Sequence, residues 1–259
     1  MKTALLCLGI FLPVAATAVA APINVAILGG APFNPAGNAD VQAMLNATGL
    51  LGTVDIFDVT NSIPTLATLL TYSAVLIYTD NGFSTHVSLG NELADYVDAG
   101  GRVVDATFSN SCCTLGGRWV TGNYALQNTS VQGGGPGLTL GTFDSTSPIM
   151  LGVTSFNGGT SSYQDLGSAR AGTTTVASWS NGVPLVITGT VNGQRRVTLN
   201  FFPVSNNVRS DFWVASTNGG RLMANSLIWV TGTTTTPEPS SVALLGLGLA
   251  GLFYRRFRS

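Results

Sequence analysis

Short apolar runs, each long enough for one strand, constrain the fold of this chain more than any other feature. The clearest are residues 23–30 (INVAILGG) and 74–78 (AVLIY), and another strand is predicted at residues 103–108 (VVDATF). A run that lacks a polar residue at every second position is typical of a strand buried on both faces, as in a parallel sheet. These runs therefore predict an α/β protein.

Helical segments separate the runs. Asn38 is placed to cap a helix that ends at Gly49, and Ser88 is placed to cap the clearest helix of the chain. A further strand is predicted at residues 54–59 and a short helix at 65–72. Because strand and helix alternate, the economical fold is an open, mostly parallel sheet flanked by helices.

The pattern changes after residue 172. Strands predicted at 173–179, 183–191 and 195–202 are separated by Asn-Gly pairs at 181–182 and 192–193. Asn-Gly between apolar runs is a strong hairpin signal, because both residues tolerate positive φ. The sequence therefore predicts a C-terminal antiparallel meander.

One α/β domain is predicted for residues 21–232. Within it, residues 109–172 are rich in turn-forming residues and are predicted as an irregular insertion. A helix around residues 220–230 closes the domain.

The N-terminus has the pattern of a signal peptide over residues 1–20. Lys2 supplies a positive charge, residues 4–14 are apolar, and Ala18-Val19-Ala20 offers the small residues that signal peptidase needs. We expect cleavage before Ala21, so the chain is predicted to be exported.

The C-terminus carries a second unusual segment. A threonine linker at residues 233–236 precedes Pro237-Glu238-Pro239, a 13-residue apolar run at 242–254, and a basic end. As a helix this run would span about 20 Å, less than the hydrocarbon core of about 30 Å. The basic residues are Arg255, Arg256 and Arg258, which would remain on the cytoplasmic side.

The order of triplet, apolar run and arginines at residues 237–259 resembles a PEP-CTERM protein-sorting signal with a short transmembrane helix. The resemblance implies recognition by an exosortase, a transient inner-membrane anchor, and removal of the tail. It also implies release or attachment at the surface of a Gram-negative bacterium that makes exopolysaccharide. Exopolysaccharide is therefore an expected partner, beside exosortase and signal peptidase.

Charge excludes one class of partner. Residues 21–232 contain seven arginines, no lysine and eleven acidic residues, which gives a net charge of −4. Because nucleic-acid binding depends on neutralising phosphates with basic side chains, we expect no nucleic-acid partner.

Several sequence segments resemble those of proteins with the class I glutamine amidotransferase-like fold, near its trehalose-utilisation branch. They are YSAVLIYTDNG, ADYVDAGGRVVDATFSNS, VNGQRRVTLNFFPV and GGRLMANSLIWVTG. The resemblance implies a flavodoxin-like sheet, with the family's nucleophilic cysteine near Thr107 and its histidine near residues 201–203. Neither residue is present there. We therefore predict a non-catalytic domain without cofactors, in which no residue is assigned a catalytic role.

Another chemistry stays open at the same sheet edge. His86 follows the third predicted strand, and Cys112 and Cys113 follow the fourth. A thiolate with a histidine base is a hydrolase-type arrangement. The alternative is that the adjacent cysteines form a disulfide in the oxidising exported compartment. No spacing of ligands predicts a metal site.

The same edge is a candidate ligand crevice, because open α/β folds bind ligands at the carboxyl ends of their strands. Short polar side chains, with the rings of Phe83, Trp119 and Tyr124 stacking on sugar faces, would suit a carbohydrate. The predicted crevice residues are Gly30, Asn34, Asp80, Asn81, His86, Ser109, Asn110, Arg118 and Trp119.

Two functions follow. The first is a binding or structural component of the exopolysaccharide or biofilm matrix, and the second is a secreted hydrolase that uses His86 with a cysteine or a serine.

Overall fold

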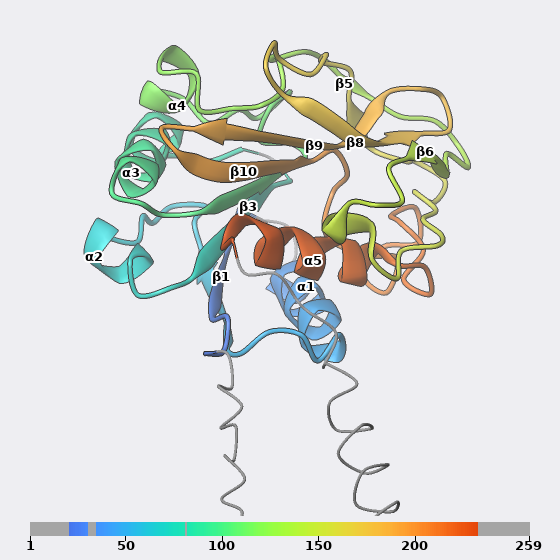
Figure 1. Ribbon diagram of the computed structural model, residues 1–259, viewed down its shortest axis with the longest axis horizontal. Coiled ribbons are helices and arrows are strands. Elements are labelled where there is room, and N and C mark those ends of the chain that lie inside the picture. The colour runs from blue at the N-terminus through green and yellow to red at the C-terminus, as the bar shows by residue number, and fades with distance from the viewer. Residues whose placement is uncertain (1–20, 31–34, 81, 233–259) are drawn as a thin grey trace, which may run out of the picture.

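An eight-stranded mixed sheet forms the centre of the computed structural model, which describes residues 21–30, 35–80 and 82–232 (Figure 1). The strand order is β2-β1-β3-β4-β10-β9-β8-β6. The strands of this sheet are β1 (Val25–Gly30), β2 (Val54–Asp58), β3 (Ala74–Thr79), β4 (Val103–Ala106), β6 (Leu140–Phe143), β8 (Thr174–Trp179), β9 (Pro184–Val191) and β10 (Gln194–Leu199). The helices are α1 (Pro35–Ala47), α2 (Leu66–Leu69), α3 (His86–Asp98), α4 (Arg118–Thr121) and α5 (Gly219–Val230), with a 3₁₀ turn η1 (Pro148–Met150).

The first half of the sheet is parallel, as the apolar runs predicted. β1 pairs in parallel with β2 on one side and with β3 on the other, and β4 continues the order beside β3. β10 then pairs in parallel with β4. The chain thus moves outward from β1 in both directions, which is the arrangement that leaves a crevice beyond the carboxyl ends of the strands.

The second half is antiparallel, and the predicted meander is confirmed. β10 pairs with β9 and β9 with β8. Asn192 and Gly193 join β9 to β10 with φ values of 48° and 79°, and Gly182 has a φ of 85° before β9. Positive φ at both Asn192 and Gly193 matches the twist of an antiparallel hairpin.

Helices cover both faces of the sheet, so its central strands are buried on both sides (Figure 1). On one face, Leu45 of α1 and Met223 of α5 belong to one apolar cluster. On the other face, Leu69 of α2 and Leu93 of α3 belong to a second cluster. Burying each such side chain contributes about 1.5–3 kcal/mol to folding, so these two clusters stabilise the packing of the helices on the sheet.

The two predicted helix caps are wrong. α1 begins at Pro35, and Asn38 lies inside it, where its Nδ2 donates to the carbonyl of Gly29 at 3.3 Å. Its Oδ1 accepts a 2.5 Å hydrogen bond from the hydroxyl of Tyr78. Asn38 thus links α1 to two strands. A Cβ at Gly29 would lie 1.9 Å from Asn38 Oδ1, so only glycine fits there.

α3 also starts earlier than its predicted cap. It begins at His86 after Thr85, and Ser88 lies exposed in its first turn. The Thr85 side chain makes no capping hydrogen bond. The helix is held instead by Leu89 and Leu93, which are fully buried.

Residues 109–172 contain only short elements, but they extend the sheet. β6 pairs with β8 and forms one edge. A separate two-stranded sheet joins β5 (Gln132–Gly133) to β7 (Gln164–Asp165). This segment lies over the carboxyl end of β4 and provides most of the walls of the candidate site.

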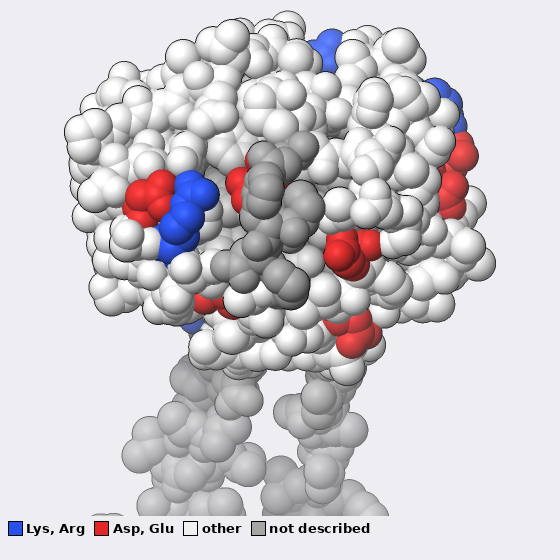
Figure 2. Space-filling view, turned by 180° about the vertical axis from the view of Figure 1, so that it is seen from behind, with Lys and Arg blue, Asp and Glu red and all other residues white. Residues whose placement is uncertain are grey.

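Two properties of the described part of the chain bear on its partners. Charged side chains form small separate groups on an otherwise uncharged face (Figure 2). Within residues 21–30, 35–80 and 82–232, no helix has the length and apolar character needed to cross a membrane.

Candidate functional site

The carboxyl ends of β1 and β3 are tied together by hydrogen bonds. The hydroxyl of Thr79 donates to the carbonyl of Gly30 at 3.0 Å and accepts from the backbone N–H of Gly82 at 2.8 Å. A Cβ at Gly30 would lie 2.9 Å from the ring of Phe83, so this ring packs directly on the strand end. Phe83 is 5% exposed and therefore has little free surface for a ligand.

A buried ion pair lies next to the end of β4. Asp105 accepts a 2.7 Å hydrogen bond from Arg196 of β10, and both side chains are fully buried. Asp105 also accepts from Asn110 Nδ2 at 2.7 Å and from the hydroxyl of Thr198 at 2.9 Å. A buried carboxylate needs this number of donors to offset its lost hydration.

Arg196 is satisfied in the same way. Its Nε donates to the carbonyl of Val103 at 3.0 Å, and a terminal nitrogen donates to the carbonyl of Tyr124 at 2.8 Å. Its guanidinium lies 4.3 Å from the ring centre of Trp119. Asp105 and Arg196 therefore hold β4, β10 and the segment after α4 in one arrangement, and neither is free to react.

Asp165 is a second buried acid near this pair. It is 1% exposed, and neither carboxyl oxygen has a hydrogen-bond partner of normal geometry among the residues that the structure describes. The pKa of Asp165 is raised to about 6, mainly by burial; the hydroxyl of Ser111 opposes this rise, the nearby charge of Asp105 adds to it, and the hydroxyl of Thr107 opposes it. Its backbone is fixed, because its N–H donates to Asn200 Oδ1 at 2.6 Å.

A polar hollow of about 260 Å³ opens above these groups, and we call it the Ser109 hollow. Its lining combines hydroxyl and amide side chains with a few apolar ones, and a single arginine is its only charged residue. The lining residues are Ser109, Asn110, Thr114, Trp119, Val120, Asn123, Ala125, Gln127, Asn128, Thr129 and Arg170.

A second hollow of about 250 Å³ lies beside the first, and we call it the His86 hollow. It is lined by Gly82, Phe83, His86, Cys112, Cys113 and Thr114, and Thr114 also lines the Ser109 hollow. Cys112 and Cys113 are joined to each other as a disulfide. Neither sulfur in this state is the thiolate that a cysteine nucleophile requires.

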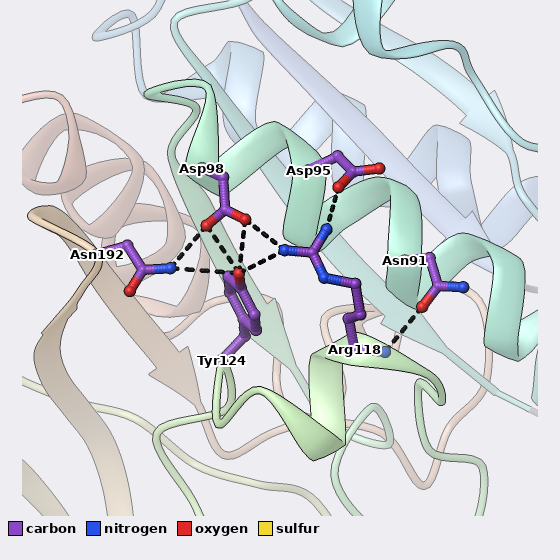
Figure 3. Close-up of polar contacts among 6 residues, drawn as sticks. All are labelled: Asn91, Asp95, Asp98, Arg118, Tyr124 and Asn192. Atoms are coloured by element: carbon purple, nitrogen blue, oxygen red, sulfur yellow. Dashed lines mark hydrogen bonds and ion pairs between the residues drawn. The ribbon is translucent and has the colours of Figure 1, made fainter.

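Arg118 has a structural role away from both hollows (Figure 3). Its guanidinium pairs with Asp95 and Asp98 of α3, and its backbone N–H donates to Asn91 Oδ1 at 2.8 Å. The hydroxyl of Tyr124 donates to Asp98 at 2.7 Å. The hydrogen bond from Tyr124, followed by those from Asn192 and Arg118, holds the pKa of Asp98 below its usual value. The network fastens α4 and the β9–β10 turn to α3.

The structure brings together only part of the predicted crevice. Ser109, Asn110 and Trp119 line one hollow and His86 lines the other. Gly30 is buried beneath Phe83, and Arg118 is held by the acids of α3. Asp80 lies outside both hollows, where burial raises its pKa, Arg209 lowers it and Asp211 raises it. Asn34 and Asn81 lie outside the described residues.

The predicted stacking of sugar rings is wrong for all three aromatic residues. Phe83, Trp119 and Tyr124 are 5%, 0% and 3% exposed. Trp119 packs against Tyr124 with a centroid distance of 5.9 Å and against Arg196. The faces of the Trp119 ring are therefore covered by Tyr124 and Arg196, because stacking and cation–π contacts both stabilise a buried ring.

Gln127, Asn128 and Arg170 were missed by sequence reasoning. Gln127 pairs with Ala169 in an isolated bridge, and Arg170 donates to Asn123 Oδ1 and to the carbonyl of Ala125. These contacts join positions more than 40 residues apart. Residues 109–172 have no apolar period that would have indicated such pairing.

Metal chemistry finds no support in the described residues. Within 21–30, 35–80 and 82–232, no three His, Cys, Asp or Glu side chains are grouped as a metal site would require.

Residues 235–259 match the family model of the PEP-CTERM protein-sorting motif. The chain carries a PEP-CTERM sorting signal. The signal indicates an exported protein that exosortase processes on the way to the cell surface. The sequence resemblance at residues 237–259 is thereby confirmed.

The sorting signal covers the tail alone, and the domain was compared separately. A search of curated proteins gives no match to the chain. Two solved structures described as ThuA-like proteins share the fold. The one from Bacteroides uniformis has a TM-score of 0.60 at 14% identity, over 86% of this chain and 97% of that protein. The one from Parabacteroides merdae has a TM-score of 0.58 at 14% identity, over 85% and 94%.

A cytoplasmic protein from Salmonella typhimurium is similar as well, with a TM-score of 0.56 at 14% identity over 80% of this chain and 99% of that protein. At such identities the likeness establishes the fold alone. The predicted amidotransferase-like, ThuA-like architecture is thereby confirmed as a fold, and nothing is transferred about activity.

Proposed function

We propose that the exported domain is a non-catalytic binding or structural component that associates with exopolysaccharide at the surface of a Gram-negative bacterium. The sorting signal at residues 235–259 carries this proposal, since it directs the chain to the surface where such polymers lie. The cytoplasmic tail arginines and the apolar run would anchor the chain only until exosortase removes them.

Two features of the domain support a role without catalysis. The strand end near Thr107, where the resembling fold places its nucleophile, has no cysteine, and Cys112 and Cys113 are joined to each other. Asp105, the acid closest to that strand end in sequence, is committed to Arg196. A surface with few charges and many hydroxyl and amide groups also suits contact with a hydrated, neutral polymer.

Replacement of Pro237, Glu238 and Pro239 by alanine is expected to abolish tail removal. The mutant chain should remain in the membrane fraction with Arg258 still attached, while the wild-type protein should leave that fraction with its tail removed. Intact-mass measurement of medium, matrix and membrane fractions from the native culture distinguishes the two forms. Replacement of Thr233 to Thr236 by serine is the matched control and should leave sorting unchanged.

A wild-type species that starts near Ala21, lacks the tail and co-fractionates with exopolysaccharide would support both halves of the proposal. Wild-type protein that keeps Arg258 in the membrane fraction would contradict it, because the tail would then act as a plain anchor.

The rival proposal is a hydrolase that uses His86, and one observation favours it: His86 and both cysteines line one hollow. If the rival is correct, His86→Ala should lower the rate of polysaccharide turnover at least 100-fold, because a general base usually contributes about that much. We expect instead no turnover by the wild type and an unchanged polymer after incubation, measured by chain length. Turnover that disappears in His86→Ala but persists in Val87→Ala, at the exposed neighbouring position, would favour the hydrolase.

A further inference from the structure

We propose that the Ser109 hollow binds one sugar ring of the polysaccharide through its hydroxyl groups. The inference rests on the proposed association with exopolysaccharide and names the site at which it occurs. The hollow holds about 260 Å³, close to the lower end of the size range of small-molecule sites, which is room for one ring rather than for a long oligosaccharide.

Three residues that line this hollow carry buried polar atoms without a hydrogen-bond partner among the described residues. They are Ser109 Oγ, Trp119 Nε1 and Gln127 Oε1. The three residues are 1%, 0% and 1% exposed. A buried polar atom without a partner is costly, and such atoms are rare in folded proteins. Three around one hollow indicate a ligand that the chain itself does not supply.

The amide of Gln127 is fixed with its oxygen left over. Its Nε2 donates to the carbonyl of Asp165 at 3.1 Å and to the carbonyl of Gly167 at 2.7 Å. Both amide hydrogens are therefore used, and the orientation of the group is determined by the backbone. Oε1 remains as an acceptor held in one position before any ligand arrives, which reduces the entropy lost on binding.

The unpartnered atoms have the chemistry of a sugar site. The indole N–H of Trp119 donates, Oε1 of Gln127 accepts, and the hydroxyl of Ser109 does both. A sugar hydroxyl also donates and accepts, so it can satisfy each of them. None of the described residues that line the hollow is acidic, so this lining lacks the carboxylates that a divalent cation prefers.

Arg170 is the single charged residue of the lining, and its guanidinium is braced by Asn123 and the carbonyl of Ala125. No acid pairs with it among the described residues. Its remaining N–H groups allow the bound ring to be either neutral or a uronic acid, with the same hydroxyl contacts in both cases.

The walls of the hollow are tied to each other. Asn110 Nδ2 donates to Asp105, and the carbonyl of Asn110 accepts from the N–H of Ser130 at 3.3 Å. The N–H of Asn128 donates to the carbonyl of Ser168 at 3.0 Å. The unpartnered atoms therefore belong to a shell whose segments are held together by hydrogen bonds.

Ser109→Ala is the variant that tests the site. The Ser109 hydroxyl has no hydrogen-bond partner in the described part of the chain, so its removal should not weaken folding. Ser111→Ala is the matched control, because Ser111 is also a buried serine, two residues along, but is not among the residues that line the hollow. The full-length protein in mild detergent is mixed with exopolysaccharide isolated from its own culture, and bound protein is measured by co-sedimentation.

We expect Ser109→Ala to weaken binding about 5-fold, the effect of one neutral hydrogen bond, and Ser111→Ala to leave it unchanged. Equal binding by wild type and both variants would overturn the sugar site while the proposed function stands, and the hollow would then hold only water. No binding by the wild type would overturn both proposals.

A second readout reports on the hollow directly. Of the four tryptophans, Trp179 donates its indole N–H to the carbonyl of Asn200, and Trp213 donates to the carbonyl of Pro203. Monosaccharides released from the polymer by acid hydrolysis should shift the indole N–H signal of Trp119 in an NMR spectrum and leave those two in place. An unmoved Trp119 signal under saturating sugar would contradict the assignment, whereas a shift with polymer but not with monosaccharide would require contacts beyond one ring.

Discussion

Arg196→Met is expected to lower the free energy of unfolding by about 3–5 kcal/mol, the usual cost of removing one partner of a buried ion pair. The side chain is fully buried, and its loss would leave Asp105 ionised without its main counter-charge. Methionine keeps most of the volume, so the loss would be electrostatic rather than a packing defect. Urea unfolding near neutral pH, followed by circular dichroism, measures the change.

Arg195→Met is the matched control from the next position of the same strand. Arg195 is exposed and lies over the ring of Trp229 at 5.1 Å, so its replacement should change stability by less than about 1 kcal/mol. The double variant Asp105→Asn with Arg196→Met should regain part of the loss, because no unpaired charge then remains. Equal, small effects of Arg195→Met and Arg196→Met would show that the ion pair is not needed for the fold.

Asp165→Asn is expected to stabilise the protein above pH 7, by up to about 3 kcal/mol if the full pKa difference is realised. In the folded protein the pKa of Asp165 is about 6, above the ordinary value of 3.8, because the carboxyl group is buried. The folded state thus binds this proton more tightly than the unfolded state. The contribution of protonated Asp165 to the free energy of unfolding is therefore fully present below about pH 4. It is lost as the pH rises through 6.

Asparagine cannot ionise, so the variant should lack this fall in stability and should match the wild type near pH 4. The backbone contacts of residue 165 with Asn200 and Gln127 do not depend on the side chain and should persist. Thermal unfolding from pH 4 to pH 8 gives the comparison. A wild-type protein that remains as stable as the variant at pH 8 would refute the buried charge.

Asp144→Asn is a control of opposite sign. Hydrogen bonds from the hydroxyl and then the backbone N–H of Thr146 lower the pKa of Asp144. Its contribution to stability is therefore present above its unfolded pKa and is lost as the pH falls. Asp144→Asn should therefore be less stable than the wild type at neutral pH, whereas Asp165→Asn should be more stable.

Sequence reasoning was accurate where local pattern and burial agree. The apolar runs became β1 and β3, since a strand buried on both faces leaves no polar alternation. The hairpin at Asn192 and Gly193 followed from two residues that tolerate positive φ. The tail was recognised from local sequence features, namely its Pro-Glu-Pro triplet, its apolar run and its terminal arginines.

Sequence reasoning was wrong where a partner distant in the chain offers a better contact than the local sequence pattern predicts. Asn38 has the side chain of a cap, but Tyr78 and Gly29 offer it buried partners inside α1. Trp119 has the side chain of a sugar platform, but Arg196 and Tyr124 occupy its faces. In both cases desolvation makes the buried contact stronger than the local alternative.

The sequence by itself determined the class of sheet, the meander and the sorting signal, because each depends on residues close together in the chain. Only the tertiary structure decided that Asp105 pairs with Arg196, 91 residues away. It alone also placed Gln127, with its amide held by Gly167 40 residues away, beside Ser109 and Trp119 in one hollow. Such contacts are selected by the total burial and hydrogen bonding of the folded chain, and no local pattern encodes them.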